Sequence, residues 1–333
     1  MIKKNLVTGI TATGDLHLGS YLGVMRHWRR YAQLYRCWYF IADLHAITTA
    51  QPPALLRQRT LDMAAMFYAL QLDPVNNTVF IQSQVPHHAE CAWALSCFAH
   101  TGEMGRMTQY KDKSEKEKGR ATLGLYSYPC LMAADILLYD AHLVPVGADQ
   151  KQHLELARNI AQRVNQYYDK EIFQIPSPEI PDTCARVMAL QNPQKKMSKS
   201  DSNTNNSVYL LDSEEVIRRK VMRAVTDSHP TLSYHPERAG LANLIEIYAS
   251  LQGMDPAAVV DRFSGQGYAV FKRAVAESII SEVLPIQQRY RSIRADEAAL
   301  CQRLAQGGVF AKEQAVKKIR YFYQHIGFIG HDS

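Results

Sequence analysis

The first half of the chain alternates short apolar segments with longer amphipathic ones, and this alternation limits what the chain can fold into. Four apolar segments are typical of buried strands, at residues 5–10, 37–46, 77–84 and 143–149. Helical patterns accompany them, at residues 20–35, 52–72 and 150–168. Strands that alternate with helices run parallel and need crossover connections. We therefore expect an α/β fold with a doubly wound, Rossmann-like parallel sheet.

The pattern changes after about residue 205, where only helical segments follow. They lie at residues 213–225, 241–251, 267–293 and 309–328. Prolines in segment 174–184 and a lysine/serine stretch mark the joint. We expect a catalytic domain at 1–205 and a smaller all-α domain at 206–333. The pattern also allows the last helix to pack back on the catalytic domain.

Composition excludes several classes of protein. With 333 residues, two domains are the prior expectation. No segment approaches 18 consecutive apolar residues, so we expect no membrane association, and the N-terminus lacks a signal-peptide pattern. A cytoplasmic location follows as an expectation. The six cysteines form no C-x-x-C pair, so we predict neither a structural metal site nor disulfides. The net charge of +6 permits a nucleic-acid partner without requiring one.

Two local motifs carry the functional argument. The stretch "KKMSKSDSN" at 195–203 concentrates lysines and serines, although composition alone favours a solvated loop. Gly9 and Gly14 have the spacing of a phosphate loop, but Asp15 follows where such a loop needs lysine, so we reject that class. His17 and Ser20 then stand at the start of the first helix. The imidazole can donate to a phosphate there, or it can be an incidental helix cap.

Together the two motifs resemble class I aminoacyl-tRNA synthetases, which pair an H-x-G element with a K-M-S-K-S element. The intervening "LMAADILLYDAHLVPVGADQKQHLELARNIA", with "IADLHAIT", "FIQSQVPHHAE", "GEMGRMTQYKDKS" and "AVTDS", closely resembles the tryptophanyl-tRNA synthetase family. The resemblance extends from residue 5 to about residue 325. It implies a tryptophan–tRNA ligase, which activates L-tryptophan with ATP to tryptophanyl-adenylate and pyrophosphate. The amino acid is then transferred to the 3' end of its tRNA.

The resemblance also implies residues that act on ATP. This reaction needs no protein nucleophile, so catalysis rests on alignment and charge stabilisation. The catalytic residues implied are Lys113, Lys196, Ser198 and Lys199. The ATP-binding residues implied are Thr11, His17, Gly19, Ser20, Gly147, Asp149, Lys196, Met197, Ser198, Lys199 and Ser200. Mg²⁺ is expected to be held mainly by the ATP phosphates. Ser20, Ala12 and Thr11 depart from the family pattern, which leaves the contacts of this loop with ATP undefined.

The tryptophan pocket is implied in the same way. Asp135 matches the residue that accepts the indole N–H, and a carboxylate among apolar neighbours is costly to bury without a partner. The other tryptophan-binding residues implied are Gly9, His45, Tyr128, Met132, Ile136, Val144, Val146 and Gln150. For the four apolar residues the alternative is plain core packing, and for His45 it is a core histidine with satisfied hydrogen bonds.

The helical domain is implied to bind the tRNA anticodon, and the family resemblance implies a homodimer. Two basic clusters are candidates for phosphate contacts, Arg218, Arg219, Lys220 and Arg223, and Lys312, Lys317, Lys318 and Arg320. Either cluster can instead be a solvated helix face. Two other functions stay open, tyrosine specificity on the same scaffold and a non-catalytic regulator that binds tryptophan or RNA.

Overall fold

A computed structural model describes residues 3–72, 77–116, 121–147, 150–179, 187–198, 201–229 and 231–329, with the backbone alone at 112, 113, 115 and 116. Contacts divide the chain into two compact units. The first comprises residues 1–13, 29–180 and 293–333, and the second comprises 14–28 and 181–292. This division differs from a boundary at residue 205. The functional division into 1–205 and 206–333 stays a prediction.

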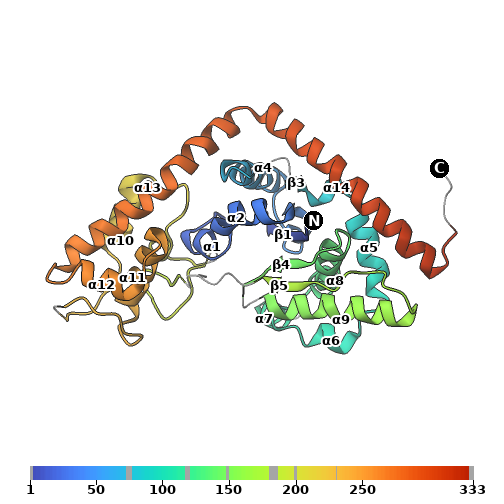
Figure 1. The fold of residues 1–333 in the computed structure, drawn as a ribbon, viewed down its shortest axis with the longest axis horizontal. Coiled ribbons are helices and arrows are strands. Elements are labelled where there is room, and N and C mark those ends of the chain that lie inside the picture. Colours follow the sequence, from blue (N-terminus) through green and yellow to red (C-terminus); the bar gives the residue numbers. More distant parts are fainter. Residues whose placement is uncertain are drawn as a thin grey trace. The chain divides into compact units, whose positions relative to one another are not determined.

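The first unit contains a five-stranded parallel sheet, which confirms the predicted doubly wound fold (Figure 1). Its order is β3-β2-β1-β4-β5, with β1 at Asn5–Thr11, β2 at Arg36–Ala42, β3 at Asn77–Ile81, β4 at Leu143–Pro145 and β5 at Ser177–Glu179. The strand order reverses between β1 and β4. In open α/β sheets, ligands bind beyond the carboxyl ends of the strands at such a reversal.

The fifth strand corrects the prediction, which treated segment 174–184 only as a joint. Pro178 lies inside β5 and pairs in register with Val144. Proline cannot donate a hydrogen bond to a sheet, so it is confined to edge strands and strand ends. β5 is the last strand in the order, where one side of its backbone needs no partner strand.

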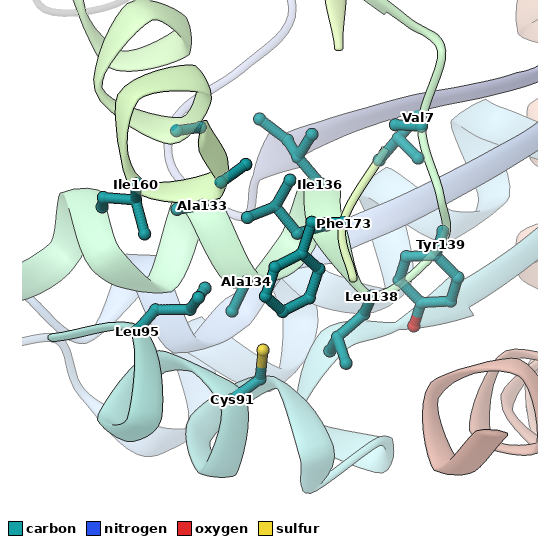
Figure 2. Close-up of a cluster of buried hydrophobic side chains, with 14 of the residues drawn as sticks. Val7, Cys91, Leu95, Ala133, Ala134, Ile136, Leu138, Tyr139, Ile160 and Phe173 are labelled. Carbon is teal, nitrogen blue, oxygen red and sulfur yellow. The ribbon is translucent and has the colours of Figure 1, made fainter. Parts of the chain in front are cut away.

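Both faces of the sheet are buried because side chains alternate along each strand. Trp38, Phe40 and Ala42 of β2 join one large core, whereas the intervening Tyr39 and Ile41 are buried outside that cluster. Helices α5 (His87–Ser96), α8 (Leu123–Leu137), α9 (Lys151–Tyr167) and α14 (Glu297–Ile326) contribute to this core. Figure 2 shows Cys91 and Leu95 of α5 facing Ala134 of α8 within it. This unit also contains α3 (Asp43–Ala46), α4 (Pro53–Ala69), α6 (Thr101–Gly105), α7 (Thr108–Lys116) and, from residue 29, α2 (Trp28–Leu34).

The predicted continuous helix at 20–35 is wrong. The segment forms α1 (Leu18–Gly23), a 3₁₀ turn (Met25–His27) and α2 (Trp28–Leu34). Val24 separates the first two, with a φ of −138° and a ψ of −59° that no α-helix accommodates. Gly23 and the β-branched Val24 have low helix propensity, which explains why the apolar period continues while the helix does not.

In the part that the structure describes, the second unit is helical apart from its loops and isolated bridges. It contains α10 (Glu214–Met222), α11 (Ala239–Gln252), α12 (Pro256–Arg262) and most of α13 (Tyr268–Ala295). Ser213 caps α10 by accepting a hydrogen bond from the Val216 N–H. Glu214 in the first turn and Arg219 in the last turn complement the helix dipole. Within the ranges given above, no helix is both long and apolar enough to cross a membrane.

Helix α14 packs on β3 through glycine, and this contact gives a stability prediction. A Cβ at Gly307 would lie 1.9 Å from the Val79 carbonyl oxygen, whereas one at Gly308 would lie 3.2 Å from the Gln84 side-chain oxygen. We expect Gly307→Ala to lower the free energy of unfolding by at least about 1–3 kcal/mol, because the backbone of a sheet strand cannot yield easily. Gly308→Ala should be near neutral, because a flexible side chain can move and alanine favours the helix by about 1 kcal/mol. Equal effects in urea unfolding would contradict this close approach.

Candidate active site

Asp135 is the centre of a buried polar cluster in the first unit. It lies in α8 and is 1% exposed. Its Oδ2 accepts a hydrogen bond from His45 Nε2 at 2.7 Å. Its Oδ1 accepts from Gln82 Nε2 and from His88 Nδ1, each at 2.6 Å. These donors come from different elements, α3 after β2, the turn after β3, and α5. The structure thus brings together the predicted Asp135 and His45.

The electrostatics of this cluster keep Asp135 ionised. Burial raises the pKa of the carboxyl group, but the charge and hydrogen bonds of His45 and the hydrogen bond of His88 outweigh it and lower the pKa to about 2. An ionised carboxylate is an acceptor only, so both imidazoles donate to it. The Tyr139 hydroxyl lies 2.8 Å from His88 Nε2 and extends the chain of hydrogen bonds. Asp135 is therefore suited to accept a further N–H from a ligand.

Tyr128 lies beside this cluster on the same helix. Its ring meets His45 edge-on, with the ring centroids 6.1 Å apart. Its hydroxyl donates to Gln109 Oε1 at 3.2 Å and lies 2.6 Å from the Nε2 atom of the buried His153. Burial raises the pKa of Tyr128 to about 12, so the hydroxyl stays neutral at physiological pH. Three residues predicted to bind tryptophan, Asp135, His45 and Tyr128, therefore lie together.

The predicted apolar residues divide between core and margin. Ile136, Val144 and Val146 are buried in the large core, as Figure 2 shows for Ile136, and Met132 packs partly buried against it. The core-packing alternative therefore holds for the first three, whatever else they contact. Gly9 is exposed, yet a Cβ there would come within 2.3 Å of the Phe40 ring. Glycine is required by this neighbouring strand, independently of any substrate.

The other predicted residues of the first unit follow the ends of β1 and β4. Thr11 ends β1, and Gly147 accepts a hydrogen bond from the Gln150 N–H at the start of α9. These two chain segments flank the reversal of strand order. The backbone of Lys113 lies in α7. The side chain of Lys113 and the whole of Asp149 lie outside the described residues.

His17 begins α1 in the second unit. Its Nδ1 accepts a hydrogen bond from the Ser20 N–H at 3.3 Å, and its Nε2 lies 3.2 Å from the Ser20 hydroxyl. His17 therefore caps the start of α1 through Ser20, and its contact with ATP stays a prediction. A Cβ at Gly19 would lie 3.1 Å from His17 Nδ1 and 3.4 Å from Val187, so glycine allows close packing here.

The stem of the lysine/serine loop lies in the same unit. The Met197 N–H donates to the Val187 carbonyl at 3.1 Å, and the Met197 side chain is buried. Lys196 pairs with Met188 in an isolated antiparallel bridge, and its side chain is exposed. Ser198 is half-buried. Lys199 and Ser200 lie outside the described residues.

One segment joins these two elements. The Leu18 N–H donates to the Val208 carbonyl at 2.8 Å, and the Leu210 N–H donates to the Leu16 carbonyl at 2.9 Å. The Ser207 hydroxyl in this segment donates to the Ser198 carbonyl at 3.3 Å. The structure therefore brings the predicted His17 element and the loop stem together, although they lie about 180 residues apart in sequence.

Buried polar side chains anchor both sides of the loop. Asn243 of α11 accepts from the Met188 N–H at 2.8 Å and donates to the Met188 carbonyl at 3.0 Å. Lys220 of α10 donates to the Ser207 carbonyl at 2.8 Å and to Asp212 Oδ2 at 2.7 Å. The loop thus leaves and re-enters a rigid frame.

These contacts correct part of the predicted basic clusters. Lys220 is buried, and Lys318 donates to the Ile172 carbonyl at 2.9 Å and pairs with Asp140. Both lysines are structural, and neither is a free phosphate ligand or a solvated face residue. Arg218 pairs with two glutamates, Glu214 and Glu277. The exposed members are Arg219, Arg223, Lys312, Lys317 and Arg320.

Among the described residues, no group of three or more His, Cys, Asp or Glu side chains could hold a metal ion. Cys37, Cys91, Cys97, Cys130 and Cys301 are free thiols.

A doubly wound parallel sheet, together with an H-x-G helix start bonded to the stem of a K-M-S-K-S loop, defines a class I aminoacyl-tRNA synthetase. The family model described as "tRNA synthetases class I (W and Y)" matches residues 3–283. The chain belongs to this family.

Similar proteins extend over the whole length. Tryptophan–tRNA ligase of Clostridium perfringens is 47% identical over 327 residues, covering 98% of each chain. The crystal structure of tryptophanyl-tRNA synthetase from Mycoplasma pneumoniae has a TM-score of 0.88 at 32% identity and covers 99% of each chain. That from Campylobacter jejuni, complexed with ADP and tryptophan, has a TM-score of 0.82 at 33% identity, covering 97% of this chain and 100% of the other.

Sequence reasoning missed several residues of the polar clusters. Gln82 and His88 lie in "FIQSQVPHHAE", which contributed to the resemblance but received no role, and His153 lies on the apolar face of α9. A signal was present, because a buried Asp135 requires hydrogen-bond donors, and Gln82 and His88 follow the end of β3 in the sequence. Their identity depended on long-range contacts.

The reassignment of Lys220 gives a prediction. Lys220→Met should lower the free energy of unfolding by about 3 kcal/mol, because it leaves the half-buried Asp212 carboxylate without its cation. The exposed neighbour Arg219→Met should change it by less than about 0.5 kcal/mol. Urea unfolding of both variants measures the difference. A neutral Lys220→Met would return this lysine to the surface cluster.

Proposed function

We propose that the chain is a tryptophan–tRNA ligase that joins L-tryptophan to its tRNA at the expense of ATP. Relatives named tryptophan–tRNA ligase are 45–47% identical over nearly the full chain, which supports this function. The observation that carries it is the buried, ionised Asp135 carboxylate, which can accept the indole N–H. A phenyl side chain offers no hydrogen-bond donor at that position.

The first step requires the carboxylate of tryptophan to attack the α-phosphate of ATP, and pyrophosphate leaves. Alignment and stabilisation of the negative charge on the leaving group drive such a step. We assign the exposed Lys196, with Ser198 and the undescribed Lys199 and Ser200, to the phosphates. Mg²⁺ enters with the ATP phosphates as part of that substrate. Lys113 is assigned to the phosphates on the family resemblance.

The remaining site assignments also rest on the family resemblance. His17, Gly19 and Ser20 are proposed to contact the nucleotide, with Thr11, Gly147 and Asp149 at the adenosine. Tyr128 and Gln150 are proposed to bind the α-amino group of tryptophan.

The second step requires tRNA. We assign anticodon binding to the helical part of the chain, with the exposed Arg219 and Arg223 of the α10 region as candidates for phosphate contacts. The homodimer and the cytoplasmic location stay predictions.

Amino-acid-dependent exchange of labelled pyrophosphate into ATP tests the function, with each of the twenty amino acids. We expect exchange with tryptophan, and weaker exchange with an analogue in which sulfur replaces the indole nitrogen. The preference should be at least about 1–3 kcal/mol, the range for leaving a buried polar group unpaired. Asp135→Ala should remove most of this preference. If the wild type preferred tyrosine, the assignment of tryptophan as substrate would be overturned. If the wild type and Asp135→Ala preferred tryptophan over the sulfur analogue equally, the shape of the pocket, and not the carboxylate, would select the substrate.

The phosphate role of the loop has a matched control in adjacent lysines. Lys196→Ala should slow exchange by about 10²–10³-fold, as expected on removing one group that stabilises transition-state charge. Lys195→Ala removes an equally exposed charge next to it and should change the rate less than about threefold, since its effect is long-range and screened. Tryptophan affinity, measured by equilibrium dialysis, should change little in either variant. A joint loss of tryptophan binding and exchange in Lys196→Ala would contradict the role.

A further inference from the structure

The hydrogen-bond capacity of Asp135 is unevenly used. A carboxylate offers about four lone-pair positions, two on each oxygen. Gln82 and His88 occupy both positions of Oδ1, and His45 occupies one position of Oδ2. Among the described residues, no further donor reaches the carboxylate, so one acceptor position of Oδ2 is open. Asp135 can thus accept a hydrogen bond from a ligand at a single position.

His88 is fixed in orientation by the rings around it and by hydrogen bonds at both of its ring nitrogens. It is 0% exposed, and its ring lies among three aromatic rings, with centroid distances of 6.0 Å to Phe40, 5.9 Å to Phe80 and 5.5 Å to Tyr139. One ring nitrogen donates to Asp135 and the other pairs with the Tyr139 hydroxyl. Because each nitrogen has its own partner, the ring cannot flip without losing both hydrogen bonds.

Gln82, the other donor to Oδ1, is also fixed at both ends of its amide group. It is 0% exposed, and its amide nitrogen donates to Asp135 Oδ1. Its amide oxygen accepts from the Leu44 N–H at 3.1 Å, next to His45. The donors on Oδ1 therefore come from two independently anchored side chains.

We propose that His88 is a positioning residue which, with Gln82, saturates Oδ1 of Asp135 and aims the open position of Oδ2 at the indole N–H of tryptophan. This inference rests on the proposed function. Without the donors on Oδ1, the carboxylate can rotate about its Cβ–Cγ bond and turn its lone pairs away from the ligand. Hydrogen bonds weaken steeply with such misalignment. His88 never contacts the substrate in this role, and it acts through Asp135.

A purely structural role is the competing explanation, since His88 also links α5 to α8. Both roles predict lower stability when His88 is replaced. They differ in selectivity. A structural role lowers the exchange activity with tryptophan and with its sulfur analogue alike, whereas a positioning role lowers mainly the activity with tryptophan. The ratio of the two kcat/KM values is independent of the fraction of folded enzyme.

The test measures this ratio by pyrophosphate exchange in wild type, His88→Leu, His88→Asn and Tyr139→Phe. Wild type should prefer tryptophan by roughly 5- to 100-fold. His88→Leu should reduce the preference by at least about fivefold. His88→Asn places an amide nitrogen near the position of Nδ1, keeps the donor to Asp135 and should restore most of the ratio. Tyr139→Phe, the matched control, keeps that donor and should change the ratio less than about threefold.

Other results of these measurements would overturn the proposal. An unchanged ratio in His88→Leu, with both substrates weakened equally, would overturn the proposal and leave the proposed function intact. A wild type that activates tryptophan without preferring it to the analogue would overturn both the proposal and the role of Asp135. If His88→Leu does not fold, Gln82→Met removes the other donor to Oδ1 and should lower the ratio at least about threefold. The proposal would also be overturned if Gln82→Met left the ratio unchanged and His88→Asn failed to restore it.

Discussion

The burial of one ionised carboxylate organises the first unit of this molecule. Asp135 stands in α8 between buried apolar neighbours, where an unpaired charge would cost several kcal/mol. It is tolerated because His45, Gln82 and His88 supply three hydrogen bonds. Those donors come from the segments after β2 and β3 and from α5, so each of these elements must end or begin within reach of a single side chain.

The same segments are also bonded to each other. The Ser83 N–H and hydroxyl donate to the Asp43 carboxylate, and the Leu44 N–H donates to Gln82. The carboxyl ends of β2 and β3 therefore carry a cross-linked platform. A binding group on such a platform is held by rigid elements, which is what a directional hydrogen bond to a ligand demands.

The sequence predicted the parts of the fold that follow from periodicity and failed where a single residue overrides it. The parallel sheet follows from apolar segments separated by helical ones. β5 was missed because Pro178 argues against a strand unless the strand lies at an edge, and edge position is a property of the assembled sheet. The break at Val24 was missed because the apolar spacing of segment 20–35 continues through it.

The site was predictable to the extent that its motifs are local. Asp135, His45 and Tyr128 were identified from short stretches and lie together. Lys220 and Lys318 were misassigned because helical spacing reveals charge, whereas their acceptors Ser207, Asp212, Ile172 and Asp140 lie elsewhere in the chain. Long-range pairing of this kind has no local pattern.

The second unit has its own constraint, which concerns how the start of α1 and the stem of the lysine/serine loop are linked. The start of α1 and the stem of the lysine/serine loop share backbone hydrogen bonds through segment 207–210. Asn243 and Lys220 tie the two sides of the loop to α11 and α10 by buried hydrogen bonds, so a displacement of these helices must carry the stem with it. His17 and Met197 are consequently parts of one folded body. The donors to Asp135, in contrast, all come from the first unit. The hydrogen-bonded surroundings of Asp135, and the start of α1 with the stem of the lysine/serine loop, are therefore separately stabilised frameworks. Substitutions that alter one need not alter the other.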